Sequence, residues 1–305
     1  MRLDQNNHRL ANHRVAVKAK ASQIVKPTSR GVILAVMSLS LVVATVLVSS
    51  APGNSQLKKK DAEAAARANT SLRTDLNWIF GGKPQKGWYL YVLLIQRLID
   101  DDHDTGSAKF ASAVARWQGK SGLRPTGILD DETLYQMIAA WQAARLKDRT
   151  PAQPAQLLTA PIADFYDPTR AEELRQVEHQ TYAAYKRMVV AAVADRSLGL
   201  AHARKGELAP DEKMLKIVSA FRSREYQEKL RRESPNAGTA GLAVNSPHFT
   251  GRALDLYVGG DPVDTSDGNR SIQVETKVYR WLVKNAERYG FRPYCYEPWH
   301  WEYVR

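Results

Sequence analysis

Cysteine is almost absent from this chain: its 305 residues include one, Cys295. A single thiol cannot form an internal disulfide, so the fold must rest on ordinary hydrophobic cores. Repeated units and low-complexity runs are also missing. The apolar and charged fractions, 44% and 25%, are those of a globular protein, which excludes wholesale disorder.

Acidic residues are scarce at the N-terminus. The first thirty residues hold seven Lys or Arg and one acid, Asp4. The net charge of this segment is therefore half of the chain's net charge of +12. Nucleic acid is a common partner of such basic proteins. The export that the next segment predicts argues against nucleic acid and favours anionic polymers of the cell envelope.

One long apolar run is present, Val32 to Ser49, and it carries no charge. Its length is close to the minimum, about 18 residues, for crossing a bilayer. More basic residues precede it than follow it, where Lys58, Lys59 and Lys60 stand, so the N-terminus is predicted to be cytoplasmic. We expect a basic cytoplasmic tail at 1–30, a single-pass membrane anchor at 31–51 and an extracytoplasmic remainder, in the periplasm or outside the cell. The alternative is a signal peptide cleaved after Ala51, which Pro52 disfavours.

Helical patterns dominate the segment that follows. Residues 52–83 are expected to form a linker or helical stalk, with a charged, alanine-rich helix from Lys58 and a break at Gly81–Pro84. Three helices are predicted next: 88–99, 109–119, and one capped by Asp130. The stretch from Ala113 to Met137 resembles the small three-helix peptidoglycan-binding domain found beside cell-wall hydrolases. The resemblance implies such a domain at 84–147 that binds glycan; an unrelated helical hairpin is the alternative.

Helices and strands mix in the remainder of the chain. A proline-rich linker is expected at 148–165, and a second domain at 166–305. Helices are predicted at 170–195, 224–232 and 272–289, strands at 215–221, 253–258 and 299–304, and a mobile loop from Ser234 to Ser246. Without a regular βαβ repeat, this order predicts an α+β fold.

Two dense motifs carry the chemistry: SPHFTGRALD, from Ser246 to Asp255, and EPWHWEYVR, from Glu297 to Arg305. Together they offer two histidines, an aspartate and two glutamates. Three of these could hold a catalytic zinc while a carboxylate serves as base. Such a metal lowers the pKa of its water to about 7. The motifs therefore predict a metal-dependent hydrolase.

The spacing of the second motif requires a distorted strand. Pro298 prevents a helix through Glu297 and His300, and residues three apart face opposite sides of a straight strand. A bend or bulge must bring them together. Beyond it, alternation would place His300 and Glu302 on one face, and Trp299 and Trp301 on the other. Glu302 would then either orient His300 or form a solvent-facing ion pair. In the first motif, Gly251 permits the tight turn that brings His248 and Asp255 together.

These residues resemble the VanY-type zinc D-alanyl-D-alanine carboxypeptidases and their endopeptidase relatives. The family pattern S-x-H-x-x-G-x-A-x-D, then E-x-W-H, with an earlier Y/F-R-S, is matched from Phe221 onward. The resemblance implies a small antiparallel-sheet peptidase domain in which His248, Asp255 and His300 hold Zn2+. It implies Glu297 as general base and Arg222 as the partner of a substrate oxygen. Ser246 and Gln227 match family positions and are assigned to substrate binding.

Cys295 is expected to be a buried core thiol; a zinc ligand or the nucleophile of a Cys-His pair are the alternatives. The leading function is a zinc peptidase that removes a terminal D-alanine from peptidoglycan stem peptides. An endopeptidase or an L,D-carboxypeptidase on the same substrate remains open. A non-catalytic wall-binding protein with structural zinc is the alternative from another class.

Overall fold

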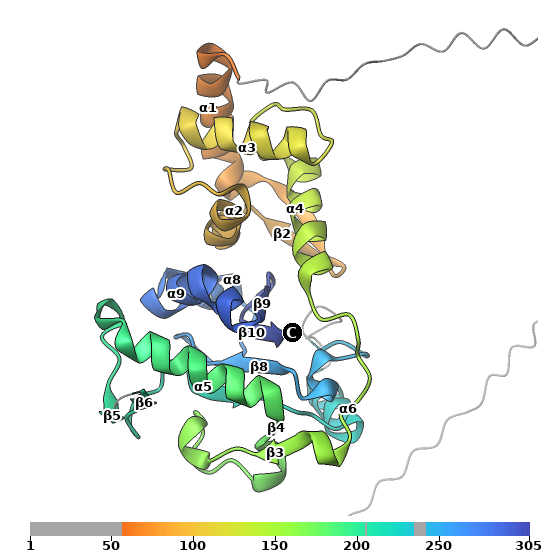
Figure 1. Cartoon of the computed structure of the whole chain (residues 1–305). Helices are drawn as coiled ribbons and strands as arrows, with labels where there is room; N and C mark the ends of the chain where they lie inside the picture. Colours follow the sequence, from red (N-terminus) through yellow and green to blue (C-terminus); the bar gives the residue numbers. More distant parts are fainter. Residues whose placement is uncertain (1–56, 205, 235–241) are drawn as a thin grey trace, which may run out of the picture. The chain divides into compact units, whose positions relative to one another are not determined.

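The computed structural model describes residues 57–204, 206–234 and 242–305 (Figure 1). The expected cytoplasmic tail, the expected anchor and part of the loop expected at Ser234–Ser246 lie outside the described residues. Within the described ranges, no helix has both the length and the apolar character that a bilayer crossing requires. All described residues belong to one compact unit.

Helices form most of the N-terminal part of this unit, and a hairpin of two short strands joins them. The elements are α1 (Lys59–Asp75), β1 (Asn77–Phe80), β2 (Lys83–Lys86), α2 (Val92–Ile99), α3 (Ala108–Lys120) and α4 (Asp131–Ala144). The predicted helices are confirmed, and α2 is preceded by a 3-10 turn at Tyr89–Tyr91. The Gly81–Pro84 segment, predicted to be only a break, contains the hairpin turn, with both glycines at positive φ.

Capping and buried polar contacts set the ends of these helices. Asp130 accepts a hydrogen bond from the backbone N–H of Thr133 at 2.9 Å, which starts α4 as predicted. The buried side chain of Asn69 in α1 bonds the backbone of Gly127 and Leu129, at 2.9 and 2.8 Å. The expected stalk helix is therefore packed into the helical part rather than standing apart from it.

The C-terminal part combines a four-stranded antiparallel sheet with helices, so the predicted α+β class is confirmed. Strand order in the sheet is β7-β8-β10-β9. The elements are β3 (Leu157–Thr159), β4 (Gln176–Glu178), α5 (His179–Ala194), β5 (His202–Arg204), β6 (Glu207–Leu208), β7 (Ile217–Ser219), α6 (Arg224–Glu233), β8 (Ala253–Leu256), α8 (Asp267–Glu275), α9 (Lys277–Asn285), β9 (Phe291–Tyr294) and β10 (Glu297–Tyr303).

Two predicted helices were too long. The helix predicted at 170–195 begins at His179, because Glu178 ends strand β4 and caps α5 by accepting from the N–H groups of Gln180 and Thr181. The helix predicted at 272–289 is two helices and a 3-10 turn. Thr276 ends α8, and its hydroxyl then caps α9 by accepting from the N–H of Tyr279 at 3.1 Å.

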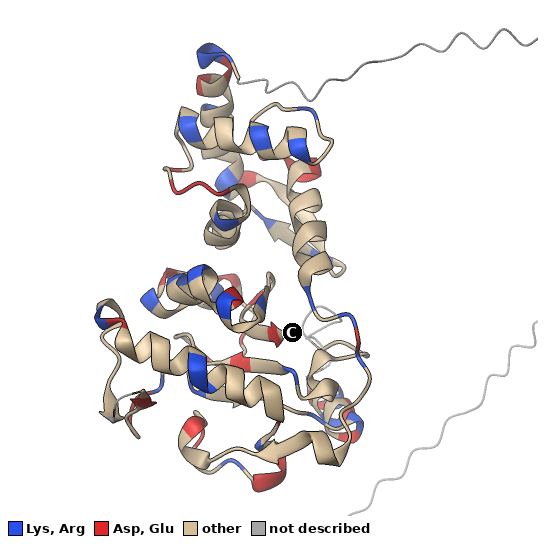
Figure 2. Ribbon diagram, in the orientation of Figure 1, with Lys and Arg blue, Asp and Glu red and all other residues tan. Residues whose placement is uncertain are grey.

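Side chains from the two parts meet at several points. Arg270 of α8, 2% exposed, donates to Gln85 Oε1 and to Tyr91 Oη, at 3.1 and 3.3 Å. Arg145, directly after α4, reaches Glu302 of β10. Figure 2 shows that basic residues follow directly after α4.

Candidate metal centre

Neighbouring strands of the sheet bring the predicted metal ligands together. Asp255 of β8 is the direct partner of His300 across the β8–β10 pair. His248 lies in a 3-10 turn at Pro247–Thr250, just before β8. Gly251 ends this turn at a φ of 66°, and a Cβ there would lie 2.7 Å from Leu157 Cδ2. The predicted glycine turn is thus present, and it sets the short path from His248 to Asp255.

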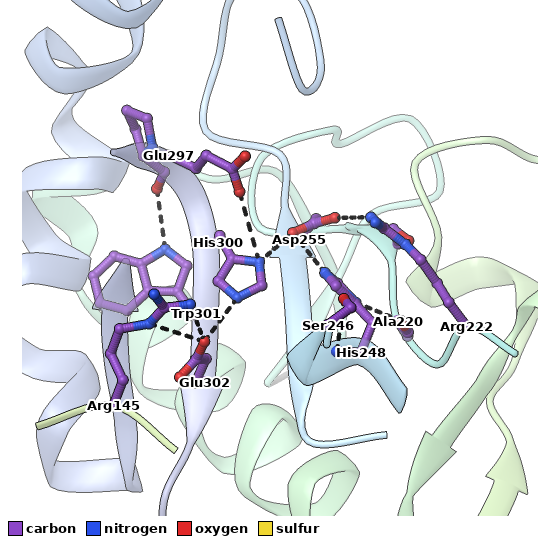
Figure 3. Close-up of polar contacts among 12 residues, drawn as sticks. Arg145, Ala220, Arg222, Ser246, His248, Asp255, Glu297, His300, Trp301 and Glu302 are labelled. Atoms are coloured by element: carbon purple, nitrogen blue, oxygen red, sulfur yellow. Dashed lines mark hydrogen bonds and ion pairs between the residues drawn. The ribbon is translucent and has the colours of Figure 1, made fainter. Parts of the chain in front are cut away.

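The three side chains offer ligand atoms that all lie within 4.8 Å of one another, and all three residues are buried. Asp255 Oδ1 is 3.3 Å from His248 Nε2 and 2.9 Å from His300 Nδ1 (Figure 3). Two imidazole nitrogens and one carboxylate oxygen form a donor set of catalytic zinc sites, which keep further positions open. The residues present therefore fit zinc.

Each ligand is oriented by a second contact. His248 Nδ1 lies 2.6 Å from the carbonyl oxygen of Ala220. A carbonyl only accepts, so Nδ1 carries the hydrogen and Nε2 is left with a lone pair for a metal. Asp255 Oδ2 accepts from Arg222. His300 Nε2 lies 3.2 Å from Glu302 Oε1, which leaves Nδ1 facing the other two ligands.

That last contact resolves the alternatives for Glu302. Its side chain is fully buried and bonded to His300, so it orients the histidine and is no solvent-facing ion pair. The predicted strand distortion is also present, as a register shift in the β9–β10 pairing between Glu297 and Trp301. Alternation resumes past this bulge, and Trp301 packs against Tyr279 of α9 at 6.4 Å between ring centroids. Trp299, predicted to face away with Trp301, instead lines the cavity beside His300.

Glu297 stands at the edge of the ligand cluster. Its Oε2 lies 4.0 Å from His300 Nδ1, and the residue is 7% exposed. It lines a cavity of about 510 Å³, of the size that ligand sites usually have. The cavity wall also includes the three ligand residues and Arg222, Ser246, Trp299, Arg145 and Arg149. A molecule in this cavity would reach both the base candidate and the metal ligands.

Arg222 follows β7 and is held at several atoms. Its Nε donates to Ser219 Oγ at 2.9 Å, and Nη1 to Gln227 Oε1 at 3.4 Å. Gln227, 1% exposed, donates in turn to the carbonyl of Ala243. The Ser246 hydroxyl caps the turn that carries His248. Substrate binding by Ser246 and Gln227, and the roles of Glu297 and Arg222 in catalysis, remain predictions.

Burial and charge shift the pKa values of the metal-free cluster in different directions. Burial and the Arg222 charge lower the pKa of His248 to about 4. Burial opposes protonation of His300 too, but hydrogen bonds to Asp255 and Glu302 raise its pKa to about 9. Burial would raise the pKa of Asp255, yet His248 and Arg222 hold it well below its usual value. Burial raises the pKa of Glu297 to about 8.

Cys295 lies outside this cluster. It is 6% exposed, and burial raises the pKa of its thiol to about 12, so little thiolate exists at neutral pH. Neither the ligand cluster nor the cavity wall includes it. The geometry agrees with the predicted core thiol.

Sequence reasoning missed Arg145 and Arg149. Both line the cavity and both reach Glu302, at 3.0 Å from Arg145 Nε and 3.4 Å from Arg149 Nη1. They precede Glu302 by more than 150 residues, outside both motifs. No local pattern in a single sequence signals such a contact.

Comparisons with known proteins agree with the two motifs. Residues 175–305 match the family model for VanY, D-alanyl-D-alanine carboxypeptidase, and residues 91–137 match the model for a peptidoglycan binding domain. No curated protein sequence matches the chain.

Three similar solved structures share 22–23% sequence identity with this chain. The LdcB LD-carboxypeptidase is 23% identical, with a TM-score of 0.36, over 52% of this chain and 71% of its own. A VanY D,D-pentapeptidase variant from a VanB-type resistance cassette, in complex with Zn(II), is 23% identical, with a TM-score of 0.32, over 54% and 89%. VanYB in complex with D-alanine-D-alanine is 22% identical, with a TM-score of 0.33, over 54% and 87%. From the two family matches and the motifs that they contain, the chain carries a VanY-family D-alanyl-D-alanine carboxypeptidase domain, preceded by a peptidoglycan-binding domain.

Proposed function

We propose that this protein is a zinc peptidase that hydrolyses peptidoglycan stem peptides by removing a terminal D-alanine. One observation carries the proposal: the buried His248–Asp255–His300 cluster and the Glu297 carboxylate line a single cavity, with Glu297 Oε2 4.0 Å from His300 Nδ1. A purely structural metal site needs no adjacent carboxylate of this kind. The non-catalytic alternative is therefore disfavoured.

Each residue of the site has a role in hydrolysis. His248 Nε2, Asp255 Oδ1 and His300 Nδ1 would hold the metal, which when bound polarises a carbonyl and activates water. Glu297 accepts a proton from the water that attacks the scissile carbonyl carbon and returns it to the leaving amine. The C–N bond breaks, and the products are a shortened peptide carboxylate and free D-alanine. Arg222, which also lines the cavity, supplies a fixed guanidinium for a substrate oxygen.

The peptidoglycan-binding domain supports the choice of substrate. A domain that holds the wall polymer raises the concentration of stem peptides near the cavity, because the second encounter becomes intramolecular. The charge pattern and the apolar run at 32–49 support an extracytoplasmic position on a single-pass anchor, with the N-terminus in the cytoplasm.

Mass spectrometry of defined muropeptides tests this function. The full chain in detergent is incubated with pentapeptide, tetrapeptide and crosslinked substrates, with zinc or with a chelator. Zinc-dependent loss of one alanine from the pentapeptide alone is the expected result. Loss from the tetrapeptide would make the protein an L,D-carboxypeptidase, and conversion of dimers to monomers an endopeptidase. No zinc-dependent product would support the wall-binding alternative.

A further inference from the structure

The carboxylate of Glu302 is held almost entirely by one short segment far away in the sequence. Arg145 donates to Oε1 through Nε, at 3.0 Å, and through Nη2. The backbone N–H of Leu146 donates to Oε2 at 2.9 Å, and Arg149 Nη1 lies 3.4 Å from Oε1. Among the described residues, the other partner of this carboxylate is His300. Figure 3 shows Arg145 and His300 approaching the carboxylate of Glu302 from different sides.

These partners belong to the end of the helical part rather than to the peptidase domain. Arg145 is the C-cap residue directly after α4, and residues 145–149 precede the segment 175–305 that matches the VanY family. The guanidinium is fixed on other sides as well. Its Nη1 donates to Gln142 Oε1 of α4 at 2.8 Å, and its Cζ lies 3.9 Å from the ring centroid of Tyr294. The guanidinium of Arg145 is therefore preorganised, so it loses little conformational entropy when it binds Glu302.

The carboxylate of Glu302 in turn contacts His300, a proposed metal ligand. Glu302 Oε1, the oxygen bound by Arg145, is the atom 3.2 Å from His300 Nε2. Loss of Arg145 would leave this buried carboxylate with the longer contact to Arg149 as its arginine partner, and a buried charge that loses its closest counter-charge is strongly destabilised. His300 would then lose the contact that keeps Nδ1 directed at Asp255. Outer partners of this kind typically change metal affinity about 10–100-fold.

We propose that Arg145 is a positioning residue of the metal centre: it holds Glu302, and through Glu302 it holds the ring of His300. The helical domain therefore completes the zinc site in addition to any binding of the wall. This inference rests on the proposed function, because it takes zinc to be the metal held by His300.

A second arginine offers a matched comparison. Arg97 of α2 pairs with Glu287, in the 3-10 turn after α9, at 3.6 Å. This pair also joins a helix of the N-terminal part to the peptidase domain. Both of its side chains are exposed, at 51% and 44%, and the ion pairs that Glu287 forms among the described residues are with Arg97 and Arg292. Loss of Arg97 removes an ion pair between the same two parts without touching His300.

The test is the zinc dissociation constant of the full chain in detergent, measured by competition with a chromophoric chelator. Arg145→Ala should weaken zinc binding about 10–100-fold, and Arg145→Lys less, since a single ammonium keeps the charge but not the paired contact. Arg97→Ala should leave the constant unchanged. In a Glu302→Gln background, Arg145→Ala should have a much smaller effect, because the residue through which it acts is already altered.

Three results would overturn the inference. They are a folded Arg145→Ala protein with wild-type zinc affinity, the same loss of affinity in the Glu302→Gln background as in the wild type, and an equal loss in Arg97→Ala. If Arg145→Ala does not fold, Arg145→Lys in both backgrounds decides the question by the same criteria. A wild-type chain that binds no zinc would instead refute the proposed function, and this inference with it.

Discussion

Glu297 Oε2 lies 4.0 Å from Nδ1 of His300, the atom through which His300 would bind a metal in the proposed site. The two residues are three apart on β10, the pairing of β10 with β9 shifts register between Glu297 and Trp301, and both residues line the same cavity. A carboxylate at this distance would be close enough to serve a reaction at a metal held by His248, Asp255 and His300, whose ligand atoms lie within 4.8 Å of one another. A substitution at Glu297 can therefore test proton transfer separately from zinc binding.

Glu297→Gln should abolish hydrolysis while zinc stays bound. The amide keeps the size of the side chain but cannot accept the proton, so kcat should fall by about 10²–10⁴. Turnover of pentapeptide and the zinc content after gel filtration are the two measurements. Glu275→Gln, an exposed position on α8, is the control. Wild-type turnover in Glu297→Gln would remove Glu297 from its proposed role.

Zinc binding should release at least one proton at pH 7. His300, with a pKa raised to about 9, carries a proton in the metal-free protein and must lose it to bind, whereas His248, with a pKa of about 4, is already neutral. The apparent affinity should therefore rise about tenfold per pH unit from pH 5 to pH 8. Calorimetry in buffers of different ionisation enthalpy measures the release.

Glu297 complicates the proton count, because its pKa of about 8 leaves it mostly protonated at pH 7 without metal. A bound cation lowers that pKa and can displace a second proton. The same calorimetry on Glu297→Gln isolates the contribution of His300. Binding without proton release in that variant would contradict the assignment of His300 as a ligand.

Gly251→Ala should cost more stability and more zinc affinity than Gly199→Ala. Both glycines have a φ of 66°, so both substitutions carry the strain of a left-handed backbone, about 1–2 kcal/mol. At Gly251 the new Cβ would also meet Leu157 Cδ2 at 2.7 Å and the backbone N of Glu178 at 3.0 Å, whereas nothing lies within 4 Å at Gly199. Urea unfolding of the two variants gives the difference. Equal losses would show that the close packing at Gly251 is unimportant.

Cys295→Ala should retain zinc binding and hydrolysis within about twofold, since the thiol is neither in the ligand cluster nor in the cavity wall. A thiol reagent should label the native protein slowly and the denatured protein fully, because burial raises the pKa of Cys295 to about 12. Loss of zinc in the alanine variant would revive the idea of a thiolate ligand.

The two motifs showed that a metal site was possible, and their resemblance to the VanY family predicted which three residues form the ligand cluster. The Gly251 turn connects His248 to Asp255, and the register shift between Glu297 and Trp301 lies on the path from Glu297 to His300. The role of Glu302 could not be decided in the same way. The alternation of side chains along the strand allows Glu302 to form either an outward ion pair or an inward hydrogen bond. Its arginine partner in the structure, Arg145, lies 157 residues earlier in the sequence.

The predicted helix boundaries were wrong where a polar side chain caps the backbone inside an otherwise helical sequence pattern. Glu178 ends a strand and starts α5, and Thr276 divides one predicted helix into two. The β1–β2 hairpin was missed because β2, Lys83–Lys86, is polar and contains Pro84, which is unfavourable in most strands. The domain boundaries, the membrane anchor and its orientation stay predictions.

Strand β10 is an interior strand of its sheet, and all seven of its residues are buried. Residues in such a position exchange their amide hydrogens only when the surrounding structure opens as a unit. The His300 amide should therefore exchange at close to the rate of global unfolding, in the metal-free protein as well. The backbone that carries Asp255 and His300 is then part of the folded sheet before the metal arrives, so these two residues need no backbone rearrangement when metal is lost and bound again.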